Sequence, residues 1–307
     1  MADQWKAHCL VVAYPGQGHI NPMLQFCKRL AYHKVKATLV TTRSFWKTVT
    51  TELTSDSNIS VETISDGYDD GVDEEANKNL KIFVQRFWQV GPQSLSELIE
   101  RLSGNGFPVD CIVYDSFVHW ALDVAKKFGL VGAAFLTQTC AVNSIYFHIH
   151  QGILKLPIDK ETKIFLPGVT ELEPLDLPMF LYLQYGMYPH HWDLLVDPFD
   201  TIGKADWMLS NSVYELEPEV ADWMKKWPMM RTIGPTVPSM FLDKRIPDDN
   251  DYGMSMFKPN NDLCMNWLNN KPKASVLYVS FGSLASYSEE QMQELARGLT
   301  DASPYFL

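Results

Sequence analysis

The sequence has no excess of basic residues and no long apolar run. Its 26 Lys and Arg residues are outnumbered by 37 Asp and Glu residues, giving a formal net charge of -11, which argues against binding to nucleic acid. No stretch approaches the roughly 20 apolar residues that a membrane helix needs, and residues 1–6 show no charged and then apolar leader. We therefore expect a cytoplasmic chain with no membrane span and no nucleic-acid partner.

Cysteine and histidine are too few and too irregularly spaced for a metal site or a disulfide framework. His148 and His150 lie two apart and His190 and His191 are adjacent, so neither pair has the helical spacing of a zinc site. We expect the acidic stretch 69–75 to be a solvated loop, and we predict no metal ion and no cofactor. The cysteines are expected to be reduced core thiols: Cys9, Cys27, Cys111, Cys140 and Cys264.

What the chain does contain is a repeated alternation of apolar runs and amphipathic segments. Apolar residues make up 46% of the 307 residues and charged residues 21%, a composition that can fill large cores. The apolar runs predict strands at residues 7–13, 35–42, 59–64, 110–114, 132–137 and 207–211. Helical patterns separate most of these strands, which indicates an α/β fold with a parallel sheet.

A stretch rich in proline and asparagine divides the chain. We expect an N-terminal domain over 1–231, an interdomain linker over 232–272 and the beginning of a second α/β domain over 273–307. A helix near 263–268, an apolar strand over 275–281 and a helix near 289–299 are predicted here. One strand and one helix cannot bury a core of their own, so we expect the second domain to be incomplete.

His19 lies in the loop YPGQGHINP at residues 14–22, between a predicted strand and a predicted helix. Unpaired N–H groups and the helix dipole disfavour an imidazolium there, so we expect His19 to be neutral near pH 7. A reference pKa of about 6.5 suits a general base for a substrate hydroxyl. A polar helix cap without function is the alternative. The loop lacks the third glycine of a dinucleotide fingerprint, which disfavours NAD.

Asp115 ends another predicted strand. Ligands of open parallel sheets collect beyond the carboxyl ends of the strands, so we expect His19 and Asp115 to converge there. The carboxylate would orient the imidazole and stabilise the imidazolium formed during proton transfer. The alternative is that Asp115 only caps a helix beginning near Val118. Because no serine elbow is present, a hydrolase is the weaker hypothesis.

Residues 166–187 contain prolines and bulky apolar side chains but show no clean period. We expect an ordered loop over a pocket that takes an apolar acceptor. The alternative is that the bulky residues only plug the surface of the domain. These residues are Met179, Phe180, Leu181, Tyr182 and Tyr185.

Five motifs follow one another along the chain: the His19 loop, YDSF at 114–117, NSVYELE at 211–217, IGP at 233–235 and VSFGS at 279–283. In this order they resemble plant UDP-sugar-dependent glycosyltransferases. The resemblance covers essentially the whole chain and implies the GT-B type, in which two facing Rossmann-like domains hold the acceptor and the nucleotide sugar. It implies that His19 is the catalytic base and Asp115 its partner, in an enzyme expected to be monomeric.

The resemblance also implies an inverting enzyme of plant secondary metabolism. Its partners are UDP-glucose as co-substrate and a small-molecule acceptor, whose hydroxyl or carboxyl group belongs to a phenolic, terpenoid or steroid compound. The family's uridine-gripping signature lies beyond residue 307, so we expect a fragment; a non-catalytic module that binds small molecules is the alternative. The implied donor-binding residues are Gly18, Thr137, Gly282 and Ser283. The implied acceptor-binding residues are Tyr14, Phe117, Gln138, Met179, Leu181, Tyr185 and Met187.

Overall fold

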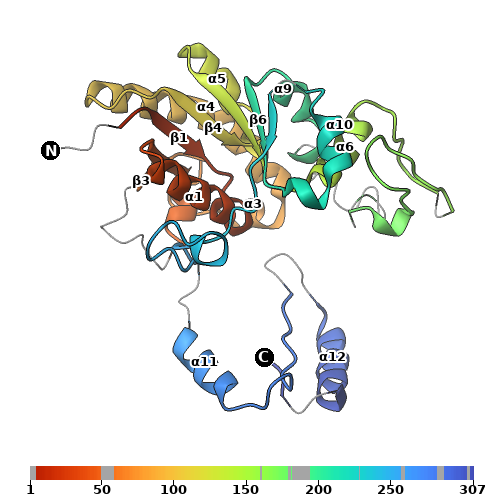
Figure 1. The fold of residues 1–307 in the computed structure, drawn as a ribbon. Helices are drawn as coiled ribbons and strands as arrows, with labels where there is room; N and C mark the ends of the chain where they lie inside the picture. The colour runs from red at the N-terminus through yellow and green to blue at the C-terminus, as the bar shows by residue number, and fades with distance from the viewer. Residues whose placement is uncertain are drawn as a thin grey trace. The chain divides into compact units, whose positions relative to one another are not determined.

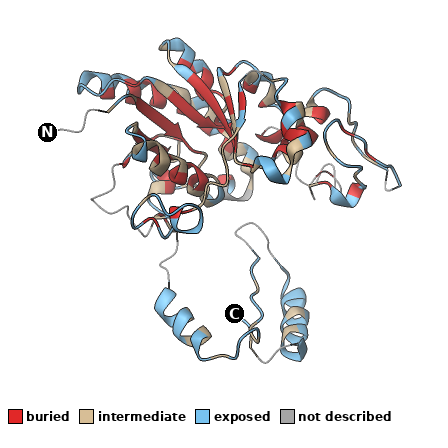
Figure 2. Cartoon of the chain, viewed as in Figure 1, coloured by how far each residue is buried: buried red, intermediate tan, exposed pale blue. Residues whose placement is uncertain are grey.

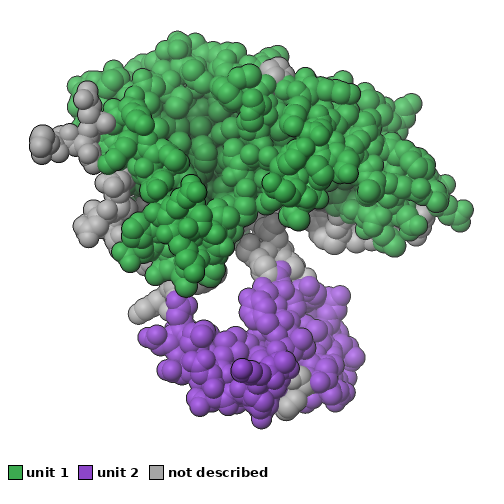
Figure 3. Space-filling view, viewed as in Figure 1, with its two compact units in different colours: residues 1–257 green, residues 258–307 purple. Residues whose placement is uncertain are grey.

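The structure is a computed structural model of the chain. It describes residues 5–49, 59–159, 161–178, 181, 194–227, 229–256, 260–281, 287–302 and 305–307. The chain divides into two compact units, residues 1–257 and 258–307 (Figure 3). The larger unit contains every strand of the sheet that the described residues form.

One parallel sheet organises the larger unit (Figure 1). Its strands are β1 (His8–Val12), β2 (Lys36–Thr42), β3 (Ile59–Ile64), β4 (Cys111–Asp115), β5 (Val131–Leu136), β6 (Trp207–Ser210) and β7 (Met230–Thr232). They lie in the order β3-β2-β1-β4-β5-β6-β7, so the direction of winding reverses between β1 and β4. The register pairs Val12 with Tyr114 across this reversal. Ligands of open parallel sheets bind at the carboxyl ends of the strands beside such a point.

Apolar side chains cover both faces of the sheet, because successive side chains of a strand point to opposite faces. On β1, Leu10 and Val12 enter one core with residues of α4 (Leu80–Gly104) and α5 (Ala121–Lys127). Cys9 and Val11 enter the other core with residues of α1 (Gln17–Tyr32). Figure 2 shows the buried residues gathered along the strands.

The larger unit contains further short helices. They are α2 (Arg43–Trp46), α3 (Glu74–Lys78), α6 (Cys140–His150), α9 (Phe199–Ile202) and α10 (Pro218–Met224). Turns of 3-10 helix lie at Ser116–Val118, Pro174–Asp176, Tyr214–Leu216 and Ser239–Phe241. Within the described ranges, no helix is long and apolar enough to cross a membrane.

The strands predicted between residues 7 and 211 are confirmed to within one residue at each end. The strand β7 was not predicted, because three residues are too few to show a period. The segment that follows β7 packs against α1. Asp249 accepts hydrogen bonds from Lys28 Nζ and from the backbone N–H of Ser239, both over 2.5 Å, and the buried Met254 joins the core beneath α1. The predicted linker over 232–272 therefore crosses the boundary between the units.

The described residues of the smaller unit form two helices and one short pairing of segments. The helices α11 (Asn261–Asn269) and α12 (Glu289–Ala302) coincide with the two predicted here. The strand predicted over 275–281 is reduced to an isolated parallel bridge between Leu277 and Phe306. None of the described residues of this unit is buried (Figure 2), because so few elements cannot cover an apolar face.

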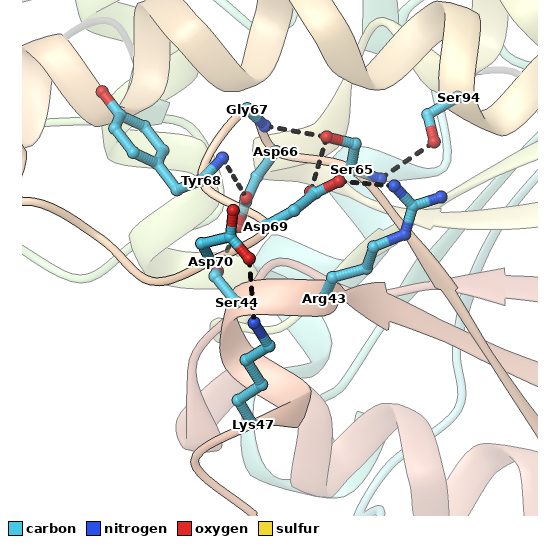
Figure 4. A network of polar contacts seen from close by, with 10 residues as sticks. All are labelled: Arg43, Ser44, Lys47, Ser65, Asp66, Gly67, Tyr68, Asp69, Asp70 and Ser94. Atoms are coloured by element: carbon cyan, nitrogen blue, oxygen red, sulfur yellow. Dashed lines mark hydrogen bonds and ion pairs between the residues drawn. The ribbon is translucent and has the colours of Figure 1, made fainter.

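The turn after β3 is held by carboxylates and their partners (Figure 4). Asp69 accepts hydrogen bonds from Arg43 over 2.5 Å and from Ser65 Oγ over 2.7 Å, and Asp70 pairs with Lys47 over 3.6 Å. The acidic stretch 69–75 thus begins with two carboxylates that have ion-pair partners. The prediction of a solvated loop did not foresee these contacts. The other residues of this network are Ser44, Asp66, Gly67, Tyr68 and Ser94.

Gly91 in α4 makes a close approach to a core ring, which gives a test of the packing. A Cβ at Gly91 would lie 2.5 Å from Trp120 Cζ2 and 3.1 Å from Phe87 Cε2. We expect Gly91→Ala to lower the free energy of unfolding by about 1–3 kcal/mol, although alanine is the better helix former. Gly104→Ala, in the same helix with open space around it, should raise that free energy by up to about 1 kcal/mol. Urea unfolding followed by circular dichroism measures both, and equal stability of the two variants would contradict this packing.

Candidate active site

His19 and Asp115 meet at the carboxyl edge of the sheet. His19 lies in the first turn of α1, directly after β1, and Asp115 is the last residue of the neighbouring β4. The Nδ1–H group of His19 donates to Asp115 Oδ2 over 2.7 Å. The carboxylate is fully buried, whereas 20% of the histidine side chain is exposed. The two residues therefore converge where the strand order reverses, as the sequence predicted.

Asp115 also caps the turn that follows it. Its Oδ1 accepts the backbone N–H of Phe117 over 2.9 Å, at the start of the 3-10 turn Ser116–Val118. The helix predicted near Val118 is only this turn, and α5 begins at Ala121. The capping role is therefore present together with the contact to His19. One carboxylate oxygen holds the backbone and the other holds the imidazole.

The pKa of His19 is raised above its ordinary value, whereas the helix dipole was expected to disfavour the imidazolium. Burial lowers this pKa, but the charge of Asp115 and the hydrogen bond to its carboxylate together raise it by more. The buried carboxylate of Asp115, in direct contact with the imidazole, outweighs the helix dipole and reverses the direction of the pKa shift. With Nδ1 bonded to Asp115, Nε2 is the nitrogen left to accept a proton, and no described residue forms a hydrogen bond to it.

Two aromatic rings flank the histidine. The ring centroids of Tyr14 and Phe117 lie 5.2 Å and 4.6 Å from that of His19. Burial, and to a lesser extent the charge of Asp115, raises the pKa of Tyr14, so its phenol stays neutral. An apolar cluster of buried side chains packs against these two rings. Its buried members include Val84, Ile145, Tyr146, Leu181, Leu194 and Leu195.

The other predicted site residues lie only partly within the described chain. Thr137 and Gln138 follow β5 at the same edge of the sheet and are half-buried. Gly18 precedes His19 in the first turn of α1, and Leu181 is buried in the apolar cluster. The predicted residues outside the described ranges are Met179, Phe180, Tyr182, Tyr185, Met187, Gly282 and Ser283.

A cavity of about 480 Å³ lies where the chain leaves β1, β5, β6 and β7. Gly18 lines it, but most of its residues were not selected from the sequence. Among these, Asn21 has a buried Oδ1 without a hydrogen-bond partner in the described part of the chain. The available signal was that the lining segments other than Tyr252 follow a strand of the sheet. The other lining residues are Pro22, Thr139, Asn211, Ser212, Val213, Leu216, Pro235, Thr236, Val237 and Tyr252.

The N-terminus of α1 is suited to an anionic group. No side chain caps it, and its first turn contains no acidic residue. The first N–H groups of a helix and the positive end of its dipole attract phosphates. No cluster of His, Cys, Asp and Glu side chains that could hold a metal ion occurs among the residues that the structure describes. A negatively charged ligand is therefore the one that this end of α1 favours.

The contact with Asp115 predicts how His19 titrates. We expect a His19 pKa above the ordinary value of about 6.5 and a lower one in Asp115→Asn, measured by NMR across pH 5–9. His19→Gln assigns the signal, and His33→Gln, at the exposed C-cap of α1, is the control. Because the folded chain binds this proton more tightly, the pair stabilises the fold fully below the unfolded pKa and less as pH rises through the folded pKa. A wild-type pKa at or below 6.5 would contradict this.

Comparison with known proteins gives consistent relatives, although no family model matches the chain. UDP-glycosyltransferase 74F2 of Arabidopsis thaliana is 41% identical over 302 residues, which cover 97% of this chain and 64% of that protein. Mogroside I-E synthase of Siraitia grosvenorii is 40% identical over 310 residues, which cover 99% of this chain and 66% of that protein. The chain thus spans about two thirds of the length of the curated relatives that it matches.

Solved structures agree with these relatives. The structure of Os79 from O. sativa in complex with UDP matches with a TM-score of 0.86 at 33% sequence identity, covering 97% of this chain and 67% of that one. A UDP-glucosyltransferase from Polygonum tinctorium matches with a TM-score of 0.71 at 22% identity, which supports the fold alone. The predicted α/β fold of the GT-B type is confirmed by this similarity. The chain belongs to the plant UDP-glycosyltransferase family.

Proposed function

We propose that this protein is an inverting glycosyltransferase that moves glucose from UDP-glucose to a hydroxyl or carboxyl group of a small apolar acceptor. His19 is the general base, and Asp115 orients it. The observation that carries this proposal is the 2.7 Å hydrogen bond from His19 Nδ1 to Asp115 Oδ2 at the reversal of the sheet. It leaves Nε2 to accept a proton and places a negative charge behind the imidazole.

The proposed reaction is a single displacement. Nε2 of His19 takes the proton of the acceptor hydroxyl, and the acceptor oxygen attacks the anomeric carbon of the sugar. The bond from that carbon to the UDP oxygen breaks as the new bond forms, so the configuration inverts and no covalent enzyme intermediate is needed. The buried carboxylate of Asp115 stabilises the imidazolium that results.

For the donor, we assign contacts to Gly18, Thr137, Gly282 and Ser283. Gly18 belongs to the uncapped first turn of α1, whose N–H groups and dipole stabilise the negative charge that develops on the departing UDP. Os79 was solved with UDP, which supports a uridine nucleotide as the leaving group. Residues 1–231 carry the acceptor side, and residues 273–307 begin the domain that binds the nucleotide sugar.

For the acceptor, we assign an apolar pocket beside the base. The rings of Tyr14 and Phe117 flank His19, and Leu181 belongs to the adjoining apolar cluster. Two relatives are named for a flavonol and for crocetin, from Arabidopsis thaliana and Crocus sativus, which supports phenolic, terpenoid or steroid acceptors. Further acceptor contacts are assigned to Gln138, Met179, Tyr185 and Met187.

Removing the base tests the proposed reaction. Because general-base catalysis contributes typically 10²–10⁴-fold, we expect His19→Ala to lower the rate of UDP-glucose-dependent glucoside formation by about that factor. Mass spectrometry on a panel of phenols and sterols measures the product, and His33→Ala should match the wild type. Equal product from His19→Ala would contradict the role of the base. Acceptor binding without any product, and unaffected by His19→Ala, would favour the non-catalytic binding module.

The pH dependence tests the role of Asp115. Transfer requires an unprotonated Nε2, so kcat/KM rises with pH through the raised pKa of His19. We expect Asp115→Asn to move this rising limb to lower pH, because the attraction that raises the pKa is lost. The plateau rate should fall, because the imidazolium formed in the reaction is less stable. A limb that stays in place or moves to higher pH would show that Asp115 does not set this pKa.

A further inference from the structure

The carboxylate of Glu217 occupies the N-terminus of α6. Its Oε1 accepts the N–H of Cys140 over 2.7 Å, and its Oε2 accepts that of Ala141 over 2.9 Å. These residues begin the helix, where N–H groups have no partner within the helix. Glu217 closes the motif at 211–217 and lies 76 residues from Ala141 in the sequence. The helix start is therefore fixed by a tertiary contact.

The chain just before α6 is fixed from the helix side as well. Thr139 Oγ1 accepts the N–H of Val142 over 3.3 Å. Asn143 Nδ2 donates to the carbonyl oxygens of Gln138 over 3.0 Å and of Thr139 over 2.8 Å. Thr137 lies between the end of β5 and this group.

Glu217 also links α6 to the end of β6. The hydroxyl of Ser212 donates to Glu217 Oε1. Gly234 packs closely behind Ser212, since an added Cβ would lie 2.8 Å from the Ser212 nitrogen. Ser212 and Thr139 both line the 480 Å³ cavity, together with Gly18. The Glu217 carboxylate therefore connects the start of α6 with the segment after β6, and both of these segments line the cavity.

The negative charge of Glu217 distinguishes α6 from α1. Both helices follow strands that end at the edge of the sheet where His19 and Asp115 meet. A carboxylate at a helix N-terminus satisfies the positive end of the dipole and repels a second anion. Neither helix has an acidic residue of its own in the first turn. Among the described residues, the start of α6 is bonded to the Glu217 carboxylate and no side chain caps α1, so α1 is the one of the two that offers its N-terminus to a phosphate.

We propose that Glu217 is a positioning residue for glycosyl transfer. By holding the start of α6, it sets the place of Thr137 and Thr139 relative to a nucleotide sugar bound over Gly18. This inference rests on the proposed function. Glu217 acts through α6 and not on the reacting atoms, so its loss weakens the binding of the donor and leaves proton transfer to His19 unchanged.

Three variants of the full chain separate positioning from folding. We expect Glu217→Ala to raise the KM for UDP-glucose about ten-fold, and Glu217→Gln to raise it less, because the amide oxygen still accepts one N–H. The KM for the acceptor should change less than about two-fold. The pH at which kcat/KM rises should stay where it is in the wild type. Glu215→Gln removes the same charge from an exposed side chain two residues away and should behave as wild type.

Hydrogen exchange tests the contact without any assay of activity. In the wild type, the amide protons of Cys140 and Ala141 are bonded to Glu217, so their exchange depends on this side chain. We expect both amides to exchange at least about ten-fold faster in Glu217→Ala and at the wild-type rate in Glu215→Gln. Unchanged exchange in Glu217→Ala would overturn the proposal at its structural basis.

The kinetic outcomes distinguish the two levels of inference. A folded wild-type protein with its complete second domain that forms no glucoside overturns the proposed function, and with it this role of Glu217. A wild type that transfers glucose, together with a folded Glu217→Ala variant of unchanged donor KM, overturns the positioning role alone. If Glu217→Ala loses activity only in proportion to the fraction of unfolded protein, with an unchanged KM for UDP-glucose, Glu217 has a structural role alone and the positioning role is overturned.

Discussion

The contact between a buried carboxylate and an imidazole connects the fold of the larger unit to its chemistry. Burying the charge of Asp115 is costly unless its oxygens are hydrogen-bonded. The backbone N–H of Phe117 satisfies one oxygen and His19 the other. His19 can reach Asp115 only because β1 and β4 are neighbours, with Val12 opposite Tyr114. The contact between His19 and Asp115 therefore depends on the reversal of strand order.

Packing on both faces of the sheet makes this geometry rigid. Leu10 and Val12 belong to one core, and Cys9 and Val11 belong to the other. A slip of β1 by one residue would exchange these faces and move the chain by about 3.3 Å. A displacement of that size would break the 2.7 Å bond between His19 and Asp115. The apolar pattern of a buried strand thus determines whether His19 meets Asp115.

The strands and the convergence of His19 with Asp115 could be predicted because apolar runs end in a glycine loop or a carboxylate, and parallel strands share an edge. The direction of the His19 pKa shift could not be predicted, because it depends on contact with a carboxylate 96 residues away. The packing of residues 232–256 likewise depends on Lys28 meeting Asp249, 221 residues distant. The bonds from Glu217 to α6 are of the same kind. Local pattern shows where side chains gather, and long-range contact decides their charge and position.

The distribution of charge at the two helix starts agrees with the proposed reaction. As a proton reaches His19, positive charge develops beside the uncapped N-terminus of α1 while negative charge develops on the leaving nucleotide. These charges stabilise each other only if the nucleotide phosphate lies near α1. An open N-terminus at α6 would offer the phosphate a competing position away from the base. The Glu217 carboxylate fills the N-terminus of α6. The phosphate is then left with the N-terminus of α1, where its negative charge assists proton transfer to His19 in the proposed reaction.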